Sequence, residues 1–157
     1  MRELSRDDLL ACCASARWAD GVAGRPYSDL PALLDRGDSV LAMLNWADVE
    51  EALAAHPRIG DRSPGADRES AWSRDEQSGT AAAGQDVLRR LREGNRAYED
   101  RFGHVYLVCA TGKSAGEMLA ILEDRLGNVP EKERMVVRDE LGKIVRLRLA
   151  KLWEETA

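Results

Sequence analysis

His56 is the side chain in this sequence best suited to acid–base chemistry, because imidazole titrates near neutral pH. It opens the stretch His56-Pro57-Arg58-Ile59-Gly60. The ring of Pro57 disfavours a helical backbone at the residue before it, so we expect a helix to end at His56. Val49, Leu53 and position 56 share one face of that helix, and the face is apolar. We therefore predict an imidazole that points inward at a helix end, beside a loop.

The commoner role of a histidine is that of a surface or hydrogen-bonded core residue. The apolar helix face and the adjoining loop favour a functional role for His56. His104, the second histidine, follows Gly103, where we expect a helix to stop, and we interpret it as structural. The distance between the two histidines and the lack of paired cysteines match no zinc site, so we expect no metal.

A second group of polar residues, Ser73, Glu76 and Gln77, follows the spacing i, i+3, i+4. On a helix this spacing places a hydroxyl, a carboxylate and an amide on one face. Such a face is most often simply solvated. The alternative is a face that binds a polar ligand, with the Glu76 carboxylate orienting an imidazole and raising its basicity.

Arg148 interrupts an apolar stripe in the last predicted helix. The stripe consists of Val137, Leu141, Ile144, position 148 and Leu152. Its spacing places the stem of Arg148 on the apolar side, whereas Arg138 and Arg146 point away from it. An arginine that reaches back to solvent is the ordinary explanation. An inward guanidinium that holds a carboxylate or ureide oxygen through two donors is the functional one.

The segments between these residues predict an all-α fold, a single-domain bundle of about six to eight helices. We expect helices near residues 5–14, 38–44, 47–55, 69–78, 85–102, 114–127 and from 130 onward. Ser5 is a predicted N-cap, Ser114 and Glu117 form a predicted capping box, and Pro130 suits a first helical position. We predict loops at residues 21–31 and 59–67. Residues 105–110 have strand propensity without a partner strand, so we expect an extended, buried connector.

Composition limits the function classes. The chain has 157 residues, 44% of them hydrophobic, and a net charge of −5. We expect one domain over residues 1–157 and no nucleic-acid partner, which usually requires a basic surface. Residues 105–110 form the longest apolar run, too short to span a bilayer. The N-terminus lacks the apolar run of a secretory signal, and the three cysteines have no disulfide spacing, so we expect a cytoplasmic protein without membrane contact.

A series of motifs occurs in order along nearly the whole chain. They are Cys12-Cys13 with Trp18, His56-Pro57-Arg58-Ile59-Gly60, Ser73-Arg74-Asp75-Glu76-Gln77, Asn95 with Tyr98, Arg101-Phe102-Gly103, Tyr106-Leu107-Val108-Cys109-Ala110 and Lys143-Ile144-Val145-Arg146-Leu147-Arg148-Leu149. Through this ordered set the sequence resembles the family of 2-oxo-4-hydroxy-4-carboxy-5-ureidoimidazoline (OHCU) decarboxylases, which act in uric acid degradation.

The resemblance implies an all-helical homodimer that converts OHCU to (S)-allantoin and CO2 without a cofactor. It implies that His56 is the catalytic acid/base, and we expect Glu76 to act with it. The implied substrate-binding residues are Pro57, Ser73, Arg74, Asp75, Glu76, Gln77, Tyr106, Leu107, Val108, Cys109, Ala110 and Arg148.

Two other functions stay open at this point. One is a non-catalytic helical module that binds a ureide or a partner protein. It would explain the apolar stripes but not the joint presence of His56, Glu76 and Arg148 at the family's positions. The other is a related amide-ring hydrolase, which would release no CO2.

Overall fold

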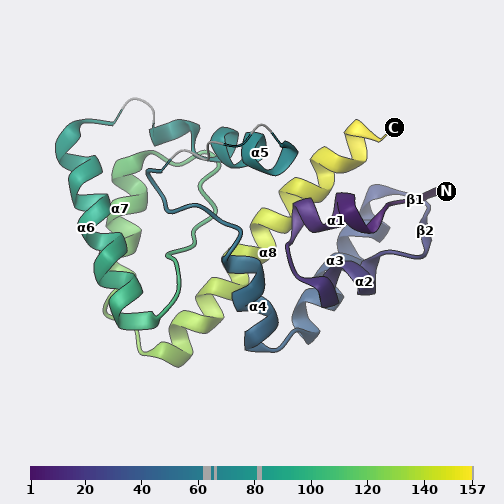
Figure 1. The fold of residues 1–157 in the computed structure, drawn as a ribbon, viewed down its shortest axis with the longest axis horizontal. Coiled ribbons are helices and arrows are strands. Elements are labelled where there is room, and N and C mark those ends of the chain that lie inside the picture. The colour runs from purple at the N-terminus through teal and green to yellow at the C-terminus, as the bar shows by residue number, and fades with distance from the viewer. Residues whose placement is uncertain (62–64, 66, 81–82, 157) are drawn as a thin grey trace. The chain divides into compact units, whose positions relative to one another are not determined.

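The structure is a computed structural model, and it describes residues 1–61, 65, 67–80 and 83–156. Within these residues the chain forms eight α-helices, one short 3₁₀ helix and one pair of two-residue strands (Figure 1). The helices are α1 (Arg6–Cys12), α2 (Ala16–Val22), α3 (Leu30–Met43), α4 (Trp46–Leu53), α5 (Arg68–Glu76), α6 (Gln85–Phe102), α7 (Ala115–Arg125) and α8 (Pro130–Glu155). The predicted all-α fold is confirmed.

Contacts along the chain divide it into two compact units, and each is described by itself. The first unit contains Met1–Ala55 and Leu141–Ala157, and the second contains His56–Glu140. Helix α8 supplies its first residues to the second unit and the remainder to the first. The single domain expected over residues 1–157 stays a prediction.

The first unit contains a helix that the sequence pattern did not predict. Residues 21–31 were expected to be a loop, but Gly21 lies inside α2, and Pro31 lies in the first turn of α3. A Cβ on Gly21 would lie 2.8 Å from Val40 Cγ1, so the glycine allows α2 and α3 to pack closely. Proline is tolerated in the first turn of a helix because the N–H it lacks has no partner there. Gly21 and Pro31 therefore lie in helices, and the prediction of a loop over residues 21–31 is wrong at both ends.

The pair of strands in the first unit was likewise not predicted. β1 (Arg2–Glu3) pairs antiparallel with β2 (Pro26–Tyr27). Strands this short carry no periodic pattern in the sequence. The predicted N-cap of α1 is confirmed, because the Ser5 hydroxyl accepts a hydrogen bond from the Asp8 N–H at 3.1 Å.

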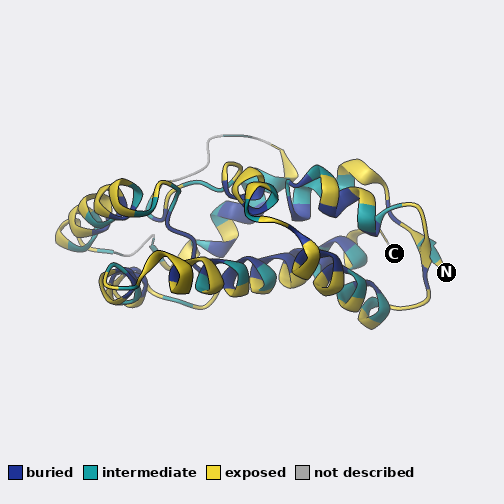
Figure 2. Ribbon diagram, turned by 90° about the horizontal axis from the view of Figure 1, so that it is seen from below, coloured by how far each residue is buried: buried dark blue, intermediate teal, exposed yellow. Residues whose placement is uncertain are grey.

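The second unit is built on α6 and α7, which lie side by side in Figure 1. Its core contains Ile59, Leu91, Tyr98, Tyr106, Val108, Ala110, Ala115, Met118, Leu119 and Leu122. Helix α6 has the predicted bounds and ends at Gly103, whose φ of 79° lies in the left-handed region. The capping box of Ser114 and Glu117 opens α7 as predicted. Each α-helix has both exposed and buried residues, as Figure 2 shows.

The connector at residues 105–110 is confirmed as an extended, mostly buried segment outside any sheet, with residues 106–110 all buried. We call residues 106–110 the central segment. In the described part of the chain, no helix combines the length and apolar character needed to cross a membrane.

The 3₁₀ helix η1 (Ser78–Thr80) lies so close to the loop after the central segment that only glycine fits. A Cβ on Gly79 would lie 2.1 Å from the carbonyl oxygen of Lys113, a backbone atom. We expect Gly79→Ala to lower the free energy of unfolding by about 1–3 kcal/mol, the usual cost of overpacking. Urea denaturation followed by circular dichroism measures this change.

Gly116→Ala is the matched control, because the nearest atom to its added Cβ is Ser114 Oγ at 3.9 Å. Gly116 lies in α7, where alanine is the better helix former, so we expect no loss or a gain of up to about 1 kcal/mol. Equal destabilisation by both substitutions would contradict the steric explanation.

Candidate functional site

The stretch that begins with His56 leaves α4 and passes into the second unit. Helix α4 ends at Leu53 with Ala54 as its C-cap, two residues before His56. His56 is outside the helix, as the ring of Pro57 predicts, but α4 ends before the expected residue 55, so His56 does not continue the helix face of Val49 and Leu53. His56 and Pro57 are both half-buried, whereas Val49 and Leu53 on the predicted inward face are buried.

Gln77 at the end of α5 holds the residues that follow Pro57. Its Oε1 accepts a hydrogen bond from the Gly60 N–H at 2.9 Å, and its Nε2 donates to the Arg58 carbonyl at 3.5 Å. Gly60 has a φ of 97°, which explains the glycine at this position. The sequence predicted that Gln77 binds substrate. In the structure its amide binds the backbone of the loop after His56.

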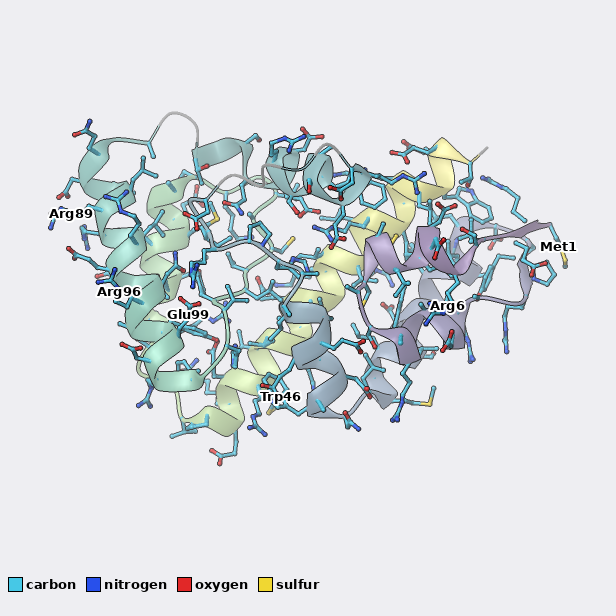
Figure 3. All side chains as sticks on the ribbon, in the orientation of Figure 1. Met1, Arg6, Trp46, Arg89, Arg96 and Glu99 are labelled. Carbon is cyan, nitrogen blue, oxygen red and sulfur yellow. The ribbon has the colours of Figure 1, made fainter. Side chains whose placement is uncertain are left out.

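Helix α6 holds the same loop from its own residues. Asn95 Nδ2 donates to the Ile59 carbonyl at 2.9 Å, and Arg58 Nε donates to the Glu99 carboxylate at 3.0 Å. Figure 3 labels Glu99 on α6. Three consecutive residues after Pro57 are therefore fixed by side chains from α5 and α6.

The predicted polar face of α5 is present. Ser73 and Glu76 are buried, and Gln77 is half-buried beside them. Asp75 is exposed, and Arg74 is half-buried, with its Nη1 donating to the Gly65 carbonyl at 2.7 Å. Of the predicted loop at residues 59–67, residues 62–64 and 66 lie outside the described residues.

The central segment lies in no sheet, and side chains bind its backbone groups. Arg125 Nη1 donates to the Leu107 carbonyl at 2.7 Å. The Cys109 N–H donates to Glu140 Oε1 at 3.0 Å, and Lys113 Nζ donates to the Cys109 carbonyl at 2.7 Å. The Tyr106 hydroxyl donates to the Met118 carbonyl at 2.9 Å. These bonds fix the segment although it has no strand partner.

Arg125 belongs to a buried ionic cluster with Glu133, Tyr98 and Asn128. Arg125 Nε lies 2.9 Å from Glu133 Oε2, and the two side chains are 5% and 0% exposed. The Tyr98 hydroxyl also donates to Glu133, as does Asn128 Nδ2 at 3.0 Å. Burial, together with the hydrogen bond to Glu133, raises the pKa of Tyr98, so the phenol stays protonated as a donor.

Cys109 shows that the central segment and α5 are electrostatically linked. Burial is the main cause that raises the pKa of the Cys109 thiol. The ammonium of Lys113 opposes this rise, while the carboxylates of Glu140 and Glu76 add to it. Glu76 on α5 is therefore close enough to the central segment for its charge to act there.

Arg148 belongs to the first unit, where it is 1% exposed and its Nη1 donates to the Ala11 carbonyl at 3.3 Å. Arg146 is exposed and pairs with Asp38. The predicted distinction between an inward Arg148 and a solvated Arg146 is confirmed.

Sequence reasoning missed the residues that hold the central segment, above all Arg125, Glu133 and Glu140. Glu133, Val137 and Glu140 follow each other at spacings of four and three, so these two glutamates continue the apolar face of α8. Two glutamates on an otherwise apolar helix face were the sequence signal that could have indicated buried, paired carboxylates. Among the described residues, no group of three or more His, Cys, Asp or Glu is placed to hold a metal ion.

Chemically, the second unit combines a half-buried imidazole, a buried carboxylate on α5 and an extended segment of backbone amides. All the predicted site residues except Arg148 belong to this unit. Such a set can transfer a proton and hold a small polar molecule through backbone and hydroxyl groups.

Comparisons with known proteins match nearly the whole length of the chain. A family model described as OHCU decarboxylase matches residues 2–150. The uric acid degradation bifunctional protein TTL of Arabidopsis thaliana is 32% identical over an alignment of 159 residues that covers 99% of this chain and 49% of that protein. The chain thus spans about half the length of this relative. The 2-oxo-4-hydroxy-4-carboxy-5-ureidoimidazoline decarboxylase of Amia calva is 31% identical over 138 residues, covering 87% of this chain and 77% of that protein.

A solved structure has the same fold. The crystal structure of OHCU decarboxylase in the presence of (S)-allantoin superposes with a TM-score of 0.83 and 29% identity. The match covers 94% of this chain and 98% of that chain.

Proposed function

The chain belongs to the OHCU decarboxylase family, and from this membership we propose that it removes CO2 from OHCU to give (S)-allantoin. The observation that carries the proposal is the family match over residues 2–150, which contains every predicted site residue, from His56 to Arg148. The geometry of the second unit supports it, because separate elements hold the backbone around His56 and along the central segment.

The reaction breaks the bond between a ring carbon and the carboxylate carbon of OHCU and leaves the electron pair on the substrate. The conjugated C=N of the ring accepts this pair, so the substrate itself supplies the electron sink. The protein has to orient the substrate and direct one proton.

We assign the proton transfer to His56, which moves a proton between the substrate hydroxyl and the ring. The Glu76 carboxylate fixes the tautomer of the imidazole, and Ser73 holds polar groups of the ureide. Leu107 and Val108 form an apolar wall that favours dispersal of the carboxylate charge. Protonation from one side of the ring sets the stereocentre of allantoin.

We assign Arg148 the role of a polar anchor for the substrate, which the sequence resemblance implies. Pro57, Arg74, Asp75, Tyr106, Cys109 and Ala110 are the other proposed contacts. Asp75 is exposed, so any contact it makes is at the rim of a site.

The function is tested directly by following the ultraviolet absorbance of OHCU as it decays, with OHCU generated in place by urate oxidation and hydrolysis. We expect the protein to accelerate the decay, release CO2 and yield optically active allantoin by circular dichroism. A binding module would give no acceleration and racemic product. An amide-ring hydrolase would consume OHCU without releasing CO2.

Gln77→Ala tests the loop after His56. The substitution removes the acceptor of the Gly60 N–H, so we expect kcat/KM for OHCU to fall by about tenfold to a hundredfold as the loop shifts. Gln77→Glu keeps an acceptor oxygen and should retain most of the activity.

Ser78→Ala, at an exposed position of η1, is the neutral control for the same measurement. A loss with Gln77→Glu as large as with Gln77→Ala would assign the effect to the Gln77 amide N–H, which donates to the Arg58 carbonyl, and not to the acceptor of the Gly60 N–H.

We also propose that the protein is a homodimer, which the family resemblance implies, and that it is cytoplasmic, because its three cysteines have no disulfide spacing. Light scattering coupled to size-exclusion chromatography measures the mass in solution, and cell fractionation measures the location. A monomeric mass or a membrane-bound fraction would contradict this part of the proposal.

A further inference from the structure

We infer that Arg125 is a positioning residue for the central segment, with Glu133 and Tyr98 holding its guanidinium in place. The inference rests on the proposed function, in which this segment lines the substrate site. It adds a residue outside the proposed set of substrate contacts, since Arg125 acts on the substrate only through the Leu107 backbone.

The backbone of the central segment is buried without being part of a sheet. Buried backbone groups need hydrogen-bond partners, and a neighbouring strand usually supplies them. Among the residues that the structure describes, the central segment has no such neighbour, and Arg125 Nη1 supplies the partner of the Leu107 carbonyl at 2.7 Å. The course of the backbone through Leu107 and Val108 is therefore set by a side chain from α7.

The planar guanidinium of Arg125 reaches two partners at once. Arg125 donates Nε and Nη2 to the Glu133 carboxylate, and it points Nη1 at the Leu107 carbonyl. Only arginine has donors in a fixed plane that reach a carboxylate and a carbonyl together. The position of the Leu107 carbonyl is thus tied to the position of Glu133.

The buried residues around Arg125 hold its guanidinium in place from several sides. Glu133 is 0% exposed and accepts from Tyr98 and Asn128 as well as from Arg125. The Arg125 guanidinium lies 4.9 Å from the centre of the Tyr106 ring and 5.9 Å from that of Tyr98. Burial alone would lower the pKa of Arg125, but the hydrogen bond and charge of Glu133 outweigh it and raise the pKa. The guanidinium therefore stays charged and held on several sides.

A buried ion pair is not in itself a source of net stability. The cost of removing two charges from water often exceeds their attraction, so apolar replacements can be as stable. Stability alone gives no reason for a charged fork at this point. The hydrogen bond to the Leu107 carbonyl gives one, because an apolar side chain of the same size could not make it.

Two variants test the inference. Arg125→Lys keeps the positive charge beside Glu133, but its single nitrogen cannot reproduce the planar fork that reaches Glu133 and the Leu107 carbonyl together. The double variant Arg125→Met/Glu133→Gln removes both charges and keeps a partner for Tyr98. We expect both to lower kcat/KM for OHCU by about tenfold to a hundredfold, because small misplacements near reacting groups have such effects. Amide hydrogen exchange of Val108 and Cys109 should accelerate at the same time.

Leu122→Ala is the control that separates positioning from stability. Leu122 is fully buried in the core between α6 and α7, where its Cδ2 would lie 2.6 Å from a Cβ on Gly94. It should lower the melting temperature but leave kcat/KM within about threefold of the parent at temperatures where it is folded. Optical purity of the allantoin is a further readout that a purely structural role would not change.

Folded Arg125 variants with kcat/KM and amide exchange equal to those of Leu122→Ala would overturn the inference. If the parent protein does not accelerate OHCU decay, the proposed function fails. The amide exchange of Val108 and Cys109 then still decides whether Arg125 positions the segment. If Arg125→Lys does not fold, the double variant decides by the same two measurements.

Discussion

Replacing His56 with alanine is expected to lower kcat/KM for OHCU by about 10²–10⁴-fold, the usual contribution of a general acid–base group. The imidazole is the proton carrier in the proposed reaction, and nothing in alanine replaces it. His56 is half-buried and lies outside a helix, so the variant should fold normally. Steady-state kinetics on freshly generated OHCU measure the effect, and circular dichroism monitors the fold.

His104→Ala is the control for this experiment, since it removes the other histidine. The His104 ring packs edge-on against Tyr98, with ring centres 5.5 Å apart, and its Nδ1 lies 3.1 Å from the Val105 carbonyl. These contacts are structural, so we expect kcat/KM within about twofold of the parent, a change near the resolution of such comparisons. Near-normal turnover by folded His56→Ala protein would refute the assignment of His56.

Glu76→Ala should also slow the reaction. In the proposed mechanism the Glu76 carboxylate orients the His56 imidazole, so its loss impairs proton transfer and does more than remove a substrate contact. The carboxylate is buried on the face of α5 that also carries Ser73. An altered pH profile of kcat would distinguish a lost partner of the imidazole from a lost substrate contact.

Helix ends were predictable from sequence where the signal is local. The capping box of Ser114 and Glu117, the stop at Gly103 and the start at Pro130 all depend on residues within one turn of each other. The start of α3 was missed, because Pro31 and the glycine-containing stretch before it have the composition of a turn. Their helical setting depends on the approach of Gly21 to Val40, which is a contact between separate elements.

In the candidate site, too, relations within one helix were predictable and contacts between separate elements were not. Periodicity alone placed Ser73 and Glu76 on one face and separated Arg148 from Arg146, since these relations follow from helix geometry. The role of Gln77 at the Gly60 N–H could not be predicted, because the two residues meet across a loop. The chemistry of the reaction came from the family resemblance and not from periodicity.

Glu133→Ala is expected to be the most destabilising single substitution at the ionic cluster. It removes the carboxylate that accepts from Arg125, Tyr98 and Asn128 and leaves the guanidinium buried without its counter-charge. Breaking a buried pair on one side costs about 3–5 kcal/mol of unfolding free energy. For a chain of this size that corresponds to a fall in Tm on the order of 10 °C. Differential scanning calorimetry and urea denaturation measure both quantities.

The exposed pair of Arg90 and Glu123 provides the matched comparison, because it joins α6 to α7 in the same unit at a distance of 2.9 Å. Its side chains are 46% and 51% exposed, so Glu123→Ala should cost less than about 1 kcal/mol. The two substitutions remove the same carboxylate chemistry and differ in burial and in the number of donors left behind. A cost for Glu133→Ala no larger than that for Glu123→Ala would mean that Arg125 finds another partner, and the central segment would then not depend on this cluster for its position.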